Sequence, residues 1–177
     1  IKIKKKIIAI MITSDKSYKN IEIKRGYVES DRLGGIDPYS ASKASAELAL
    51  KSYINTFFKN KKKNIVFGIA RAGNVIGGGD WADDRLIPDC MKSWNRKEMA
   101  KIRNPKSTRP WQHVIEAICG YLIFAQKLKI NSKLNGEVFN FGPDNKNNFS
   151  VINLIKELEK NNLKLKWKIV EEKNNIE

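Results

Sequence analysis

Tyr39 and Lys43 are spaced so that their side chains could do chemistry together. In a helix, residues four positions apart lie on the same face. A lysine cation beside a phenol favours the phenolate, which is a usable base near neutral pH. A Tyr-x-x-x-Lys match is weak alone, because most such pairs are ordinary surface neighbours. The position of this pair adds weight, since it opens a predicted helix between two predicted buried strands.

Polar residues follow both of these predicted strands. Residues Thr13–Lys16, TSDK, come after the apolar run at 7–12, and residues Arg71–Trp81, RAGNVIGGGDW, come after the run at 65–70. In open α/β sheets, ligand sites form outside the carboxyl ends of the strands. Each segment alone has a plainer interpretation, a polar turn for the first and a flexible loop for the second. Together with the tyrosine and the lysine, they predict one pocket that gathers a hydroxyl, an acid, an amine and a phenol.

Two arginines in the stretch Arg103–Val114, RNPKSTRPWQHV, are candidates for binding phosphate. The guanidinium group presents a fork of donors that suits phosphate oxygens. Arg109 stands at the entrance of a predicted helix, so it is our candidate for contacting a diphosphate. Trp111 is interpreted as a packing residue, the usual role of a buried tryptophan.

The elements that would position these residues alternate between strand and helix. The runs at 7–12 and 65–70 are continuous and apolar, which favours strands buried on both faces of a parallel sheet. A helix over about 38–58 lies between them, with Asp37 as its cap and Pro38 in its first turn. Strand, helix and strand form a parallel crossover, so the predicted class is α/β. Further along, the pattern predicts a helix at 85–97, an extended piece at 100–103, a helix at 112–128, a strand at 137–141, a helix from Ser150 to about 161 and a strand at 165–170.

Helical spacing also predicts which faces of two helices are buried. On each predicted face, apolar residues recur roughly every three or four positions, as they do along the apolar stripe of an amphipathic helix. The predicted core positions are Ala41, Ala44, Leu48 and Phe57 in the first helix, and Val114, Ile118, Tyr121, Leu122 and Ala125 in the helix at 112–128.

Charge and composition limit the classes of function. The 177 residues carry a formal net charge of +15, which attracts phosphates of any kind. The lysines are spread along the chain, so a solvated, lysine-rich surface is the plainer interpretation. No nucleic-acid-binding motif supports a basic binding module instead. No apolar stretch approaches the roughly 20 residues of a membrane helix, so no membrane contact is expected.

Metal binding and thiol redox chemistry have no support in the sequence. Cys90 and Cys119 lack metal or redox spacing, and we interpret both as buried structural thiols in a reducing cytoplasm. His113 is the single histidine and cannot build a multi-histidine site, so no metal is expected.

These motifs, in this order, resemble the extended short-chain dehydrogenase/reductase family. Within that family they are most similar to the nucleotide-sugar 4,6-dehydratases that act on CDP-glucose. The resemblance implies an α/β fold, with a partial Rossmann-like parallel sheet and a small C-terminal α/β substrate-binding portion. It spans most of residues 7–160 and rests on the segments Thr13–Tyr18, Leu33–Tyr39, Gly77–Ala82, Asp84–Asp89, Arg109–His113 and Asn140–Pro143.

The resemblance implies an NAD-dependent lyase that removes water from a nucleotide sugar, working as a homodimer through the tyrosine helix. Tyr39 would take the proton of the sugar 4-hydroxyl, Ser14 would hydrogen-bond the 4-oxygen, and Asp15 would protonate the leaving 6-hydroxyl. Lys16 stands where related enzymes carry the base for the C5 proton, and Lys43 would hold the nicotinamide ribose. The implied cofactor contacts are Thr13, Tyr39, Lys43, Ala72, Gly73 and Val75, and the implied substrate contacts are Asn74, Arg85, Leu86, Ile87, Arg103, Arg109 and His113.

One departure from the family pattern concerns the cofactor. No glycine-rich strand–turn–helix that would cradle its pyrophosphate occurs in the 177 residues. We therefore expect an N-terminally truncated form. Residues 1–80 would be the latter part of an NAD-binding Rossmann domain with the catalytic helix. Residues 81–177 would be a mixed substrate-binding region, incomplete at its C-terminus. Alone, this form should be inactive and should bind NAD weakly.

Two alternatives stay open at this point. An epimerase or decarboxylase of the same fold would share Tyr39 and Lys43, but it would not need an acid/base pair at Asp15 and Lys16. A non-catalytic basic module would instead bind nucleic acid, with a steep salt dependence.

Overall fold

Three parallel strands form the central sheet. Strand β1 (Ile7–Ser14) pairs with β2 (Ile65–Ala72), which pairs in turn with β7 (Val138–Phe141). The strands expected at 7–12 and 65–70 are confirmed, and each continues for two residues into the polar motif that follows it. The structure is a computed structural model, and it describes residues 5–59, 64–144, 149–161 and 166–170.

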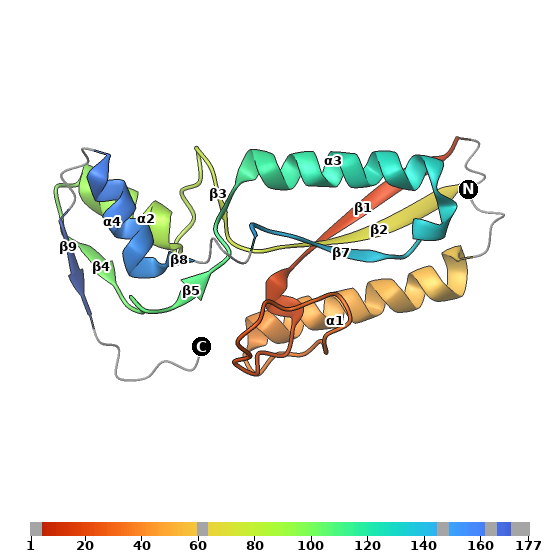
Figure 1. Cartoon of the computed structure of the whole chain (residues 1–177), viewed down its shortest axis with the longest axis horizontal. Helices are drawn as coiled ribbons and strands as arrows, with labels where there is room; N and C mark the ends of the chain where they lie inside the picture. The colour runs from red at the N-terminus through yellow and green to blue at the C-terminus, as the bar shows by residue number, and fades with distance from the viewer. Residues whose placement is uncertain (1–4, 60–63, 145–148, 162–165, 171–177) are drawn as a thin grey trace.

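Two long helices cover opposite faces of this sheet (Figure 1). Helix α1 (Pro38–Tyr53) packs on β1, and α3 (Val114–Ile130) packs on β1 and β2. Since α1 connects β1 to the neighbouring parallel strand β2, the predicted crossover and the α/β class are confirmed.

Helix α1 begins as the sequence predicts. The Asp37 side chain caps it by accepting a hydrogen bond from the Ser40 backbone nitrogen at 2.9 Å. A π-helical segment, Ile54–Phe58, continues α1 and completes the helix expected to residue 58. The buried residues are Ala44, Glu47 and Ile54, whereas the predicted core residues Leu48 and Phe57 are 56% and 50% exposed. The prediction was therefore wrong at Leu48 and Phe57, and a charged residue, Glu47, faces the sheet instead.

The buried face of α3 also differs from the predicted one. Ala117, Phe124 and Leu128 are buried, whereas Ile118 and Leu122 are exposed. Apolar residues surround this helix on most sides, so their spacing alone did not identify the inner face. Close contact with the sheet settles it: a Cβ atom added at Gly68 of β2 would come within 2.4 Å of the Phe124 ring.

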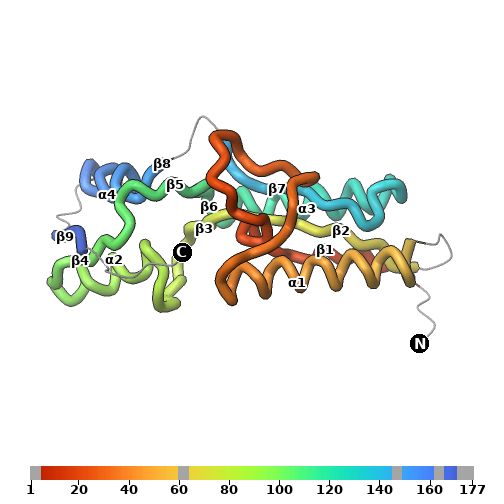
Figure 2. Tube along the Cα trace, turned by 90° about the horizontal axis from the view of Figure 1, so that it is seen from below, coloured from red at the N-terminus to blue at the C-terminus, as the bar shows by residue number. Residues whose placement is uncertain are grey.

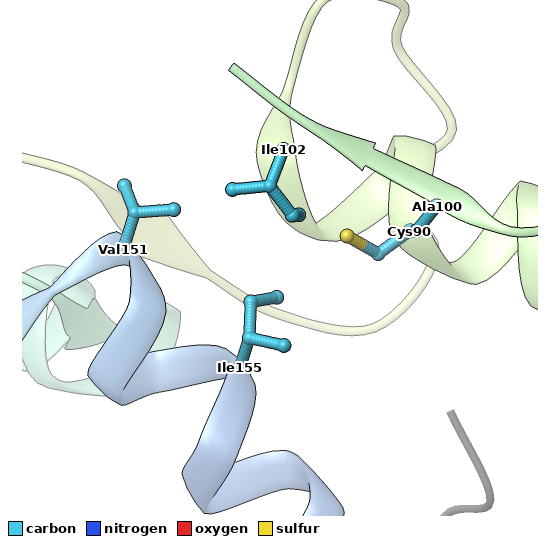
Figure 3. Packing of buried hydrophobic residues seen from close by; sticks show 5 residues of the cluster. All are labelled: Cys90, Ala100, Ile102, Val151 and Ile155. Atoms are coloured by element: carbon cyan, nitrogen blue, oxygen red, sulfur yellow. The ribbon is translucent and has the colours of Figure 1, made fainter. Parts of the chain in front are cut away.

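A smaller lobe follows β2 and closes around its own core. In it, β4 (Ala100–Ile102) pairs in parallel with β9 (Trp167–Ile169), and β5 (Thr108–Arg109) pairs with β8 (Phe149–Ser150). The helices are α2 (Leu86–Asn95) and α4 (Val151–Lys160), the second capped by Ser150 as predicted. Figure 3 shows the core between these elements, made by Cys90, Ala100, Ile102, Val151 and Ile155. The expected small C-terminal α/β portion is present.

Short elements join the two parts of the molecule. Strand β3 (Val75–Ile76), directly after β2, pairs with β6 (Gln112–His113), directly before α3. A 3₁₀ turn (Ser132–Leu134) leads from α3 toward β7. Because Gln112 and His113 lie in β6, α3 begins two residues later than the predicted start at 112.

The two cysteines have different surroundings. Cys90 is buried in the small lobe, and burial together with the nearby Asp89 raises its thiol pKa to about 12. Cys119 on α3 is exposed, which corrects the prediction that both thiols are buried. Cys119 was misplaced because α3 carries apolar residues on most sides, so the spacing did not show which side of the helix is buried.

Candidate active site

The carboxyl ends of the three sheet strands form one edge of the site. Ser14, Ala72 and Phe141 lie in register at the ends of β1, β2 and β7. In Figure 1 this edge faces the small lobe. Figure 2 shows the loop of residues 18–37 passing over the same end of the sheet, from α1 toward β7. Ligand sites in parallel sheets form at such edges.

A tight turn holds the predicted residues at the end of β1. Ser14 is followed by a single 3₁₀ turn, Asp15–Ser17, and its Oγ accepts a hydrogen bond from the Lys16 backbone nitrogen at 3.2 Å. The same hydroxyl donates to Asp15 Oδ1 at 3.1 Å. Lys16 is exposed. The turn therefore presents a hydroxyl, a carboxyl and an amine on consecutive residues, as predicted.

Asp15 holds its proton more tightly than an ordinary aspartate. Burial raises the pKa of its carboxyl, and the hydrogen bond from Ser14 and the charges of Lys16 and Arg109 lower it without cancelling the rise. A carboxyl group with a raised pKa is better suited to donate a proton near neutral pH. Arg109 is thus one of the cations whose charge acts on this carboxyl.

Tyr39 and Lys43 lie on one face of α1, as their spacing predicts. The Lys43 Nζ atom is 5.3 Å from the centre of the Tyr39 ring. The tyrosine is 57% exposed, so its phenol is accessible to a ligand. The accessible phenol and the ammonium group beside it are therefore placed to act on the same ligand.

Contacts at both ends of the intervening loop hold α1 against the turn. The Gly34 backbone nitrogen donates to the Ser17 carbonyl at 2.9 Å, and Tyr18 bridges to Leu33. Gly35 follows and lies against the first turn of α1, where an added Cβ would be 2.3 Å from the Ser40 Cβ. Farther along α1, Glu47 Oε2 accepts from Thr13 Oγ1 at 3.2 Å and from Ser17 Oγ at 3.5 Å. The structure thereby brings the tyrosine helix to the turn.

The segment after β2 lies at the sheet edge, where its predicted contacts with cofactor and substrate stay predictions. Ala72 is buried, whereas Gly73, Asn74 and Val75 are partly exposed at the sheet edge. Gly73 packs on Pro110, which an added Cβ would approach to 2.5 Å. Arg71, interpreted from sequence as favouring a binding loop, has no exposed side-chain surface and pairs with Glu47 inside the protein. This side chain therefore faces the interior of the protein and forms no part of an exposed binding loop.

The predicted phosphate-binding arginines fall into two groups. All three lie in the small lobe, and Arg109, in β5, is the one whose charge acts on the Asp15 carboxyl. Arg85 and Arg103 pair at 3.0 Å with Asp80 and Asp84, respectively. Leu86 and Ile87, predicted as substrate contacts, are partly exposed in the first turn of α2.

His113 has a structural task that the sequence did not indicate. It is the N-cap of α3, where its Nδ1 accepts a hydrogen bond from the Ile115 backbone nitrogen at 3.2 Å. The Glu116 side chain completes a capping box by accepting from the His113 backbone nitrogen at 3.0 Å. The imidazole is exposed, and its predicted contact with substrate stays a prediction.

A pocket of about 240 Å³ opens beside this helix start. It lies at the end of β7 and is lined by Gln112, Glu116, Asn140, Phe141, Gly142 and Pro143. Gln112, which is 7% exposed, donates to the Phe141 carbonyl at 2.8 Å and fixes one wall. The Asn140–Pro143 segment was part of the sequence resemblance, but no pocket was predicted there.

Comparison with known proteins identifies the family. A family model described as the NAD dependent epimerase/dehydratase family matches residues 7–142. The chain belongs to this family. The description of the family names NAD, the cofactor that the sequence resemblance implies.

Two curated dehydratases are similar in sequence. The CDP-glucose 4,6-dehydratase of Salmonella typhimurium is 48% identical over 137 residues, covering 76% of this chain and 38% of that protein. The dTDP-D-glucose 4,6-dehydratase of Dictyostelium discoideum is 29% identical over 144 residues, covering 81% of this chain and 30% of that protein. The chain thus spans well under half the length of these relatives.

Solved structures of the epimerase/dehydratase family show the same fold. A UDP-glucuronic acid 4-epimerase from Bacillus cereus, in complex with UDP-glucuronic acid and NAD, matches 93% of this chain and 48% of its own, with a TM-score of 0.76 and 21% identity. A dTDP-glucose 4,6-dehydratase from Bacillus anthracis, in complex with NAD, matches 94% of this chain and 50% of its own, with a TM-score of 0.70 and 19% identity. The partial Rossmann-like sheet expected from sequence is confirmed.

Within the described residues, no three histidine, cysteine, aspartate or glutamate side chains are grouped to hold a metal ion. Over the same residues, no helix combines the length and the apolar character needed to cross a bilayer.

Proposed function

We propose that this chain carries the catalytic residues of a nucleotide-sugar 4,6-dehydratase that acts on CDP-glucose. The observation that carries the proposal is the Ser14–Lys16 turn, docked at the sheet edge against the helix of Tyr39 and Lys43. An epimerase needs the tyrosine but has no use for a proton-donating carboxyl on that turn. The 48% identity to the Salmonella CDP-glucose enzyme supports the same choice.

The side chains divide the chemistry among them. Tyr39 takes the proton of the sugar 4-hydroxyl while Ser14 hydrogen-bonds the 4-oxygen. The carbonyl formed at C4 acidifies the C5 proton, and Lys16 is the base that removes it. Asp15 then gives its proton to the 6-hydroxyl, which leaves as water. The raised pKa of Asp15 supports this last step, because an ionised carboxylate has no proton to give.

The cofactor of this reaction is NAD, and the residues present fit one end of it. Tyr39 offers an accessible hydroxyl and Lys43 an ammonium group beside it, which are suitable donors for ribose hydroxyls. Thr13, Ala72, Gly73 and Val75 lie at or near the same strand ends. When bound, NAD would supply the hydride chemistry, accepting a hydride from C4 and donating it to C6, while the proton held by Lys16 would return to C5.

The nucleotide diphosphate of the substrate lies toward the small lobe in this proposal. Arg109 is near the catalytic turn, so it is suited to the phosphate closest to the sugar. Arg85 and Arg103 are exposed and can exchange their aspartate partners for phosphate oxygens. Asn74, Leu86, Ile87 and His113 would complete the contacts.

The assay that tests the proposal uses the complete gene product that contains these residues. Incubated with CDP-glucose, it should yield the 4-keto-6-deoxy sugar nucleotide with loss of one water, detected by mass spectrometry. Tyr39→Phe should abolish the product. Recovery of a 4-epimer with no loss of mass contradicts the dehydratase and favours an epimerase.

Assembly and location follow as parts of the same proposal. Leu48, Tyr53 and Phe57 expose 56%, 64% and 50% of their surface along α1 and its π-helical extension, which supports a homodimer through this helix. Sedimentation of the complete protein should give a dimer, and Leu48→Glu should shift it toward monomer. The exposed free thiol of Cys119 supports a reducing cytoplasm.

A further inference from the structure

A buried ion pair lies between the catalytic helix and the sheet. Glu47 of α1 and Arg71 of β2 form a double hydrogen bond, with Nε donating to Oε2 at 2.8 Å and Nη2 donating to Oε1. Neither side chain has exposed surface. Burial by itself would raise the pKa of Glu47 and lower that of Arg71, but each partner reverses the effect on the other, so both stay charged.

A buried pair of this kind is not needed for a stable core. The desolvation of two charges offsets much of their attraction, and well-packed apolar residues in the same place are often as stable or more so. A charged pair instead fixes the relative geometry of the two elements that carry it, because its hydrogen bonds are satisfied in one arrangement only. In this protein the two elements are α1 and β2, which border the proposed site.

The carboxylate of Glu47 contacts the residues on both sides of the catalytic turn. Thr13 precedes the Ser14–Lys16 turn and Ser17 follows it, and both hydroxyls donate to Glu47 Oε2. The single hydroxyl proton of Ser17 is shared between Glu47 Oε2 at 3.5 Å and the Ser14 carbonyl at 2.8 Å, and the shorter bond closes the turn. One oxygen atom of α1 is thus tied to both ends of the segment that carries the proposed acid.

The guanidinium of Arg71 extends the same network across the sheet. Thr13, Arg71 and Asn140 are in register on β1, β2 and β7. Arg71 donates to the Tyr18 hydroxyl, which donates to Asn140 Oδ1 at 2.7 Å. These contacts form a polar network that joins β1, β2, β7 and α1. On the strands, it lies one residue before the ends that border the proposed site.

We infer that Glu47 and Arg71 are positioning residues, which fix the helix of Tyr39 and Lys43 relative to the Ser14–Lys16 turn. Glu47 is one helical turn beyond Lys43, which is one turn beyond Tyr39, so a shift at Glu47 moves all three together. Neither positioning residue contacts substrate or cofactor in this inference. The expected effect on catalysis rests on the proposed function. The expected effect on the position of the turn does not.

The deciding variant is Glu47→Met with Arg71→Met, in the complete gene product. It removes both charges and fills their volume with apolar atoms, so the thermal midpoint should stay close to that of the wild type. Without the bonds to Thr13 and Ser17, kcat should fall about 10- to 100-fold, the range expected from a misplacement near 1 Å. KM should change little, because the substrate contacts are elsewhere. Amide hydrogen exchange at residues 14–18 should become faster.

Lys51→Met is the matched control. Lys51 Nζ pairs with Glu47 Oε1 at 3.1 Å from the solvent side, but it does not contact the turn. Its removal should leave kcat and the exchange at residues 14–18 unchanged. Ser17→Ala is the second test, and it decides the matter if the double variant does not fold. It retains the ion pair, removes one hydroxyl, and should lower kcat and speed the exchange in the same direction.

The possible outcomes separate the positioning role of the ion pair from the proposed function. Unchanged kcat and unchanged exchange in a folded double variant overturn the inference, as does a loss of activity that only follows unfolding. A wild-type protein without dehydratase activity refutes the proposed function instead. The exchange at residues 14–18 then decides alone whether the pair positions the turn.

Discussion

Gly68 of β2 lies directly against Phe124 of α3, with room for no side chain between them. An added Cβ would be 2.4 Å from the ring of Phe124 and 2.7 Å from Leu128 Cδ1. Gly68→Ala should therefore force α3 away from the sheet and lower the free energy of unfolding by about 1–3 kcal/mol. Chemical denaturation of the chain measures this. Gly78→Ala is the control, because its added Cβ meets nothing within 4 Å, and equal losses in the two variants would contradict the packing argument.

Removing one member of the buried ion pair should cost far more than removing both. Glu47→Ala leaves the Arg71 guanidinium charged and enclosed, which should lower the free energy of unfolding by about 3–5 kcal/mol. Lys51→Ala breaks the half-exposed pair with the same carboxylate and should cost about 1 kcal/mol or less. Urea titrations followed by circular dichroism compare the two variants. Similar losses would mean that Arg71 reaches water when Glu47 is absent.

Acidification should weaken the fold through Glu47. Its pKa is below the ordinary glutamate value in the folded chain, because the bonds and charges of Arg71 and Lys51 outweigh the effect of burial. The unfolded chain therefore binds the proton more readily. The stability that Glu47 contributes is fully present above the ordinary glutamate pKa and is lost as the pH falls through the lower, folded one. Relative to wild type, the Glu47→Met/Arg71→Met variant should lose less stability across this acid window. Parallel curves would show that other carboxyl groups control the response.

Asp15→Asn should separate the oxidation step from the elimination step. The amide keeps the shape of the turn but has no acidic proton, so the 6-hydroxyl should no longer leave. In deuterated water, recovered CDP-glucose should still gain deuterium at C5, since Tyr39 and Lys16 are intact. Formation of the 6-deoxy product should fall about 100-fold or more, the size of a general-acid contribution. Full 6-deoxy product formation by this variant would exclude Asp15 as the acid.

NAD binding by these 177 residues should be weak. The residues present fit the nicotinamide ribose, but the sequence has no glycine-rich turn that would hold the pyrophosphate. Isothermal titration of the 177-residue chain with NAD should give no saturable binding at micromolar concentrations. Tight binding would show that another part of the chain holds the phosphates.

Local patterns predicted most of the fold. The strands at Ile7–Ser14 and Ile65–Ala72 were recognisable because a continuous apolar run suits a strand covered on both faces. The start of α1 was recognisable from its cap at Asp37. The inner face of α3 was not, because a helix that is apolar on most sides has no unique periodic stripe.

The site was predicted only where its members are close in sequence. Tyr39 and Lys43 are paired by helical spacing, and Ser14, Asp15 and Lys16 are consecutive. The Glu47–Arg71 pair joins residues 24 positions apart. The sequence analysis did not single out Glu47, and it assigned Arg71 to a binding loop. A charged residue in a helix most often faces water, so only tertiary structure could show that these two charges neutralise each other.

The cap at the start of α3 determines what His113 can offer to a neighbour. Its Nδ1 is already an acceptor for the Ile115 backbone nitrogen, so the proton of the neutral ring belongs on Nε2. The exposed imidazole therefore presents a hydrogen-bond donor outward without needing a positive charge.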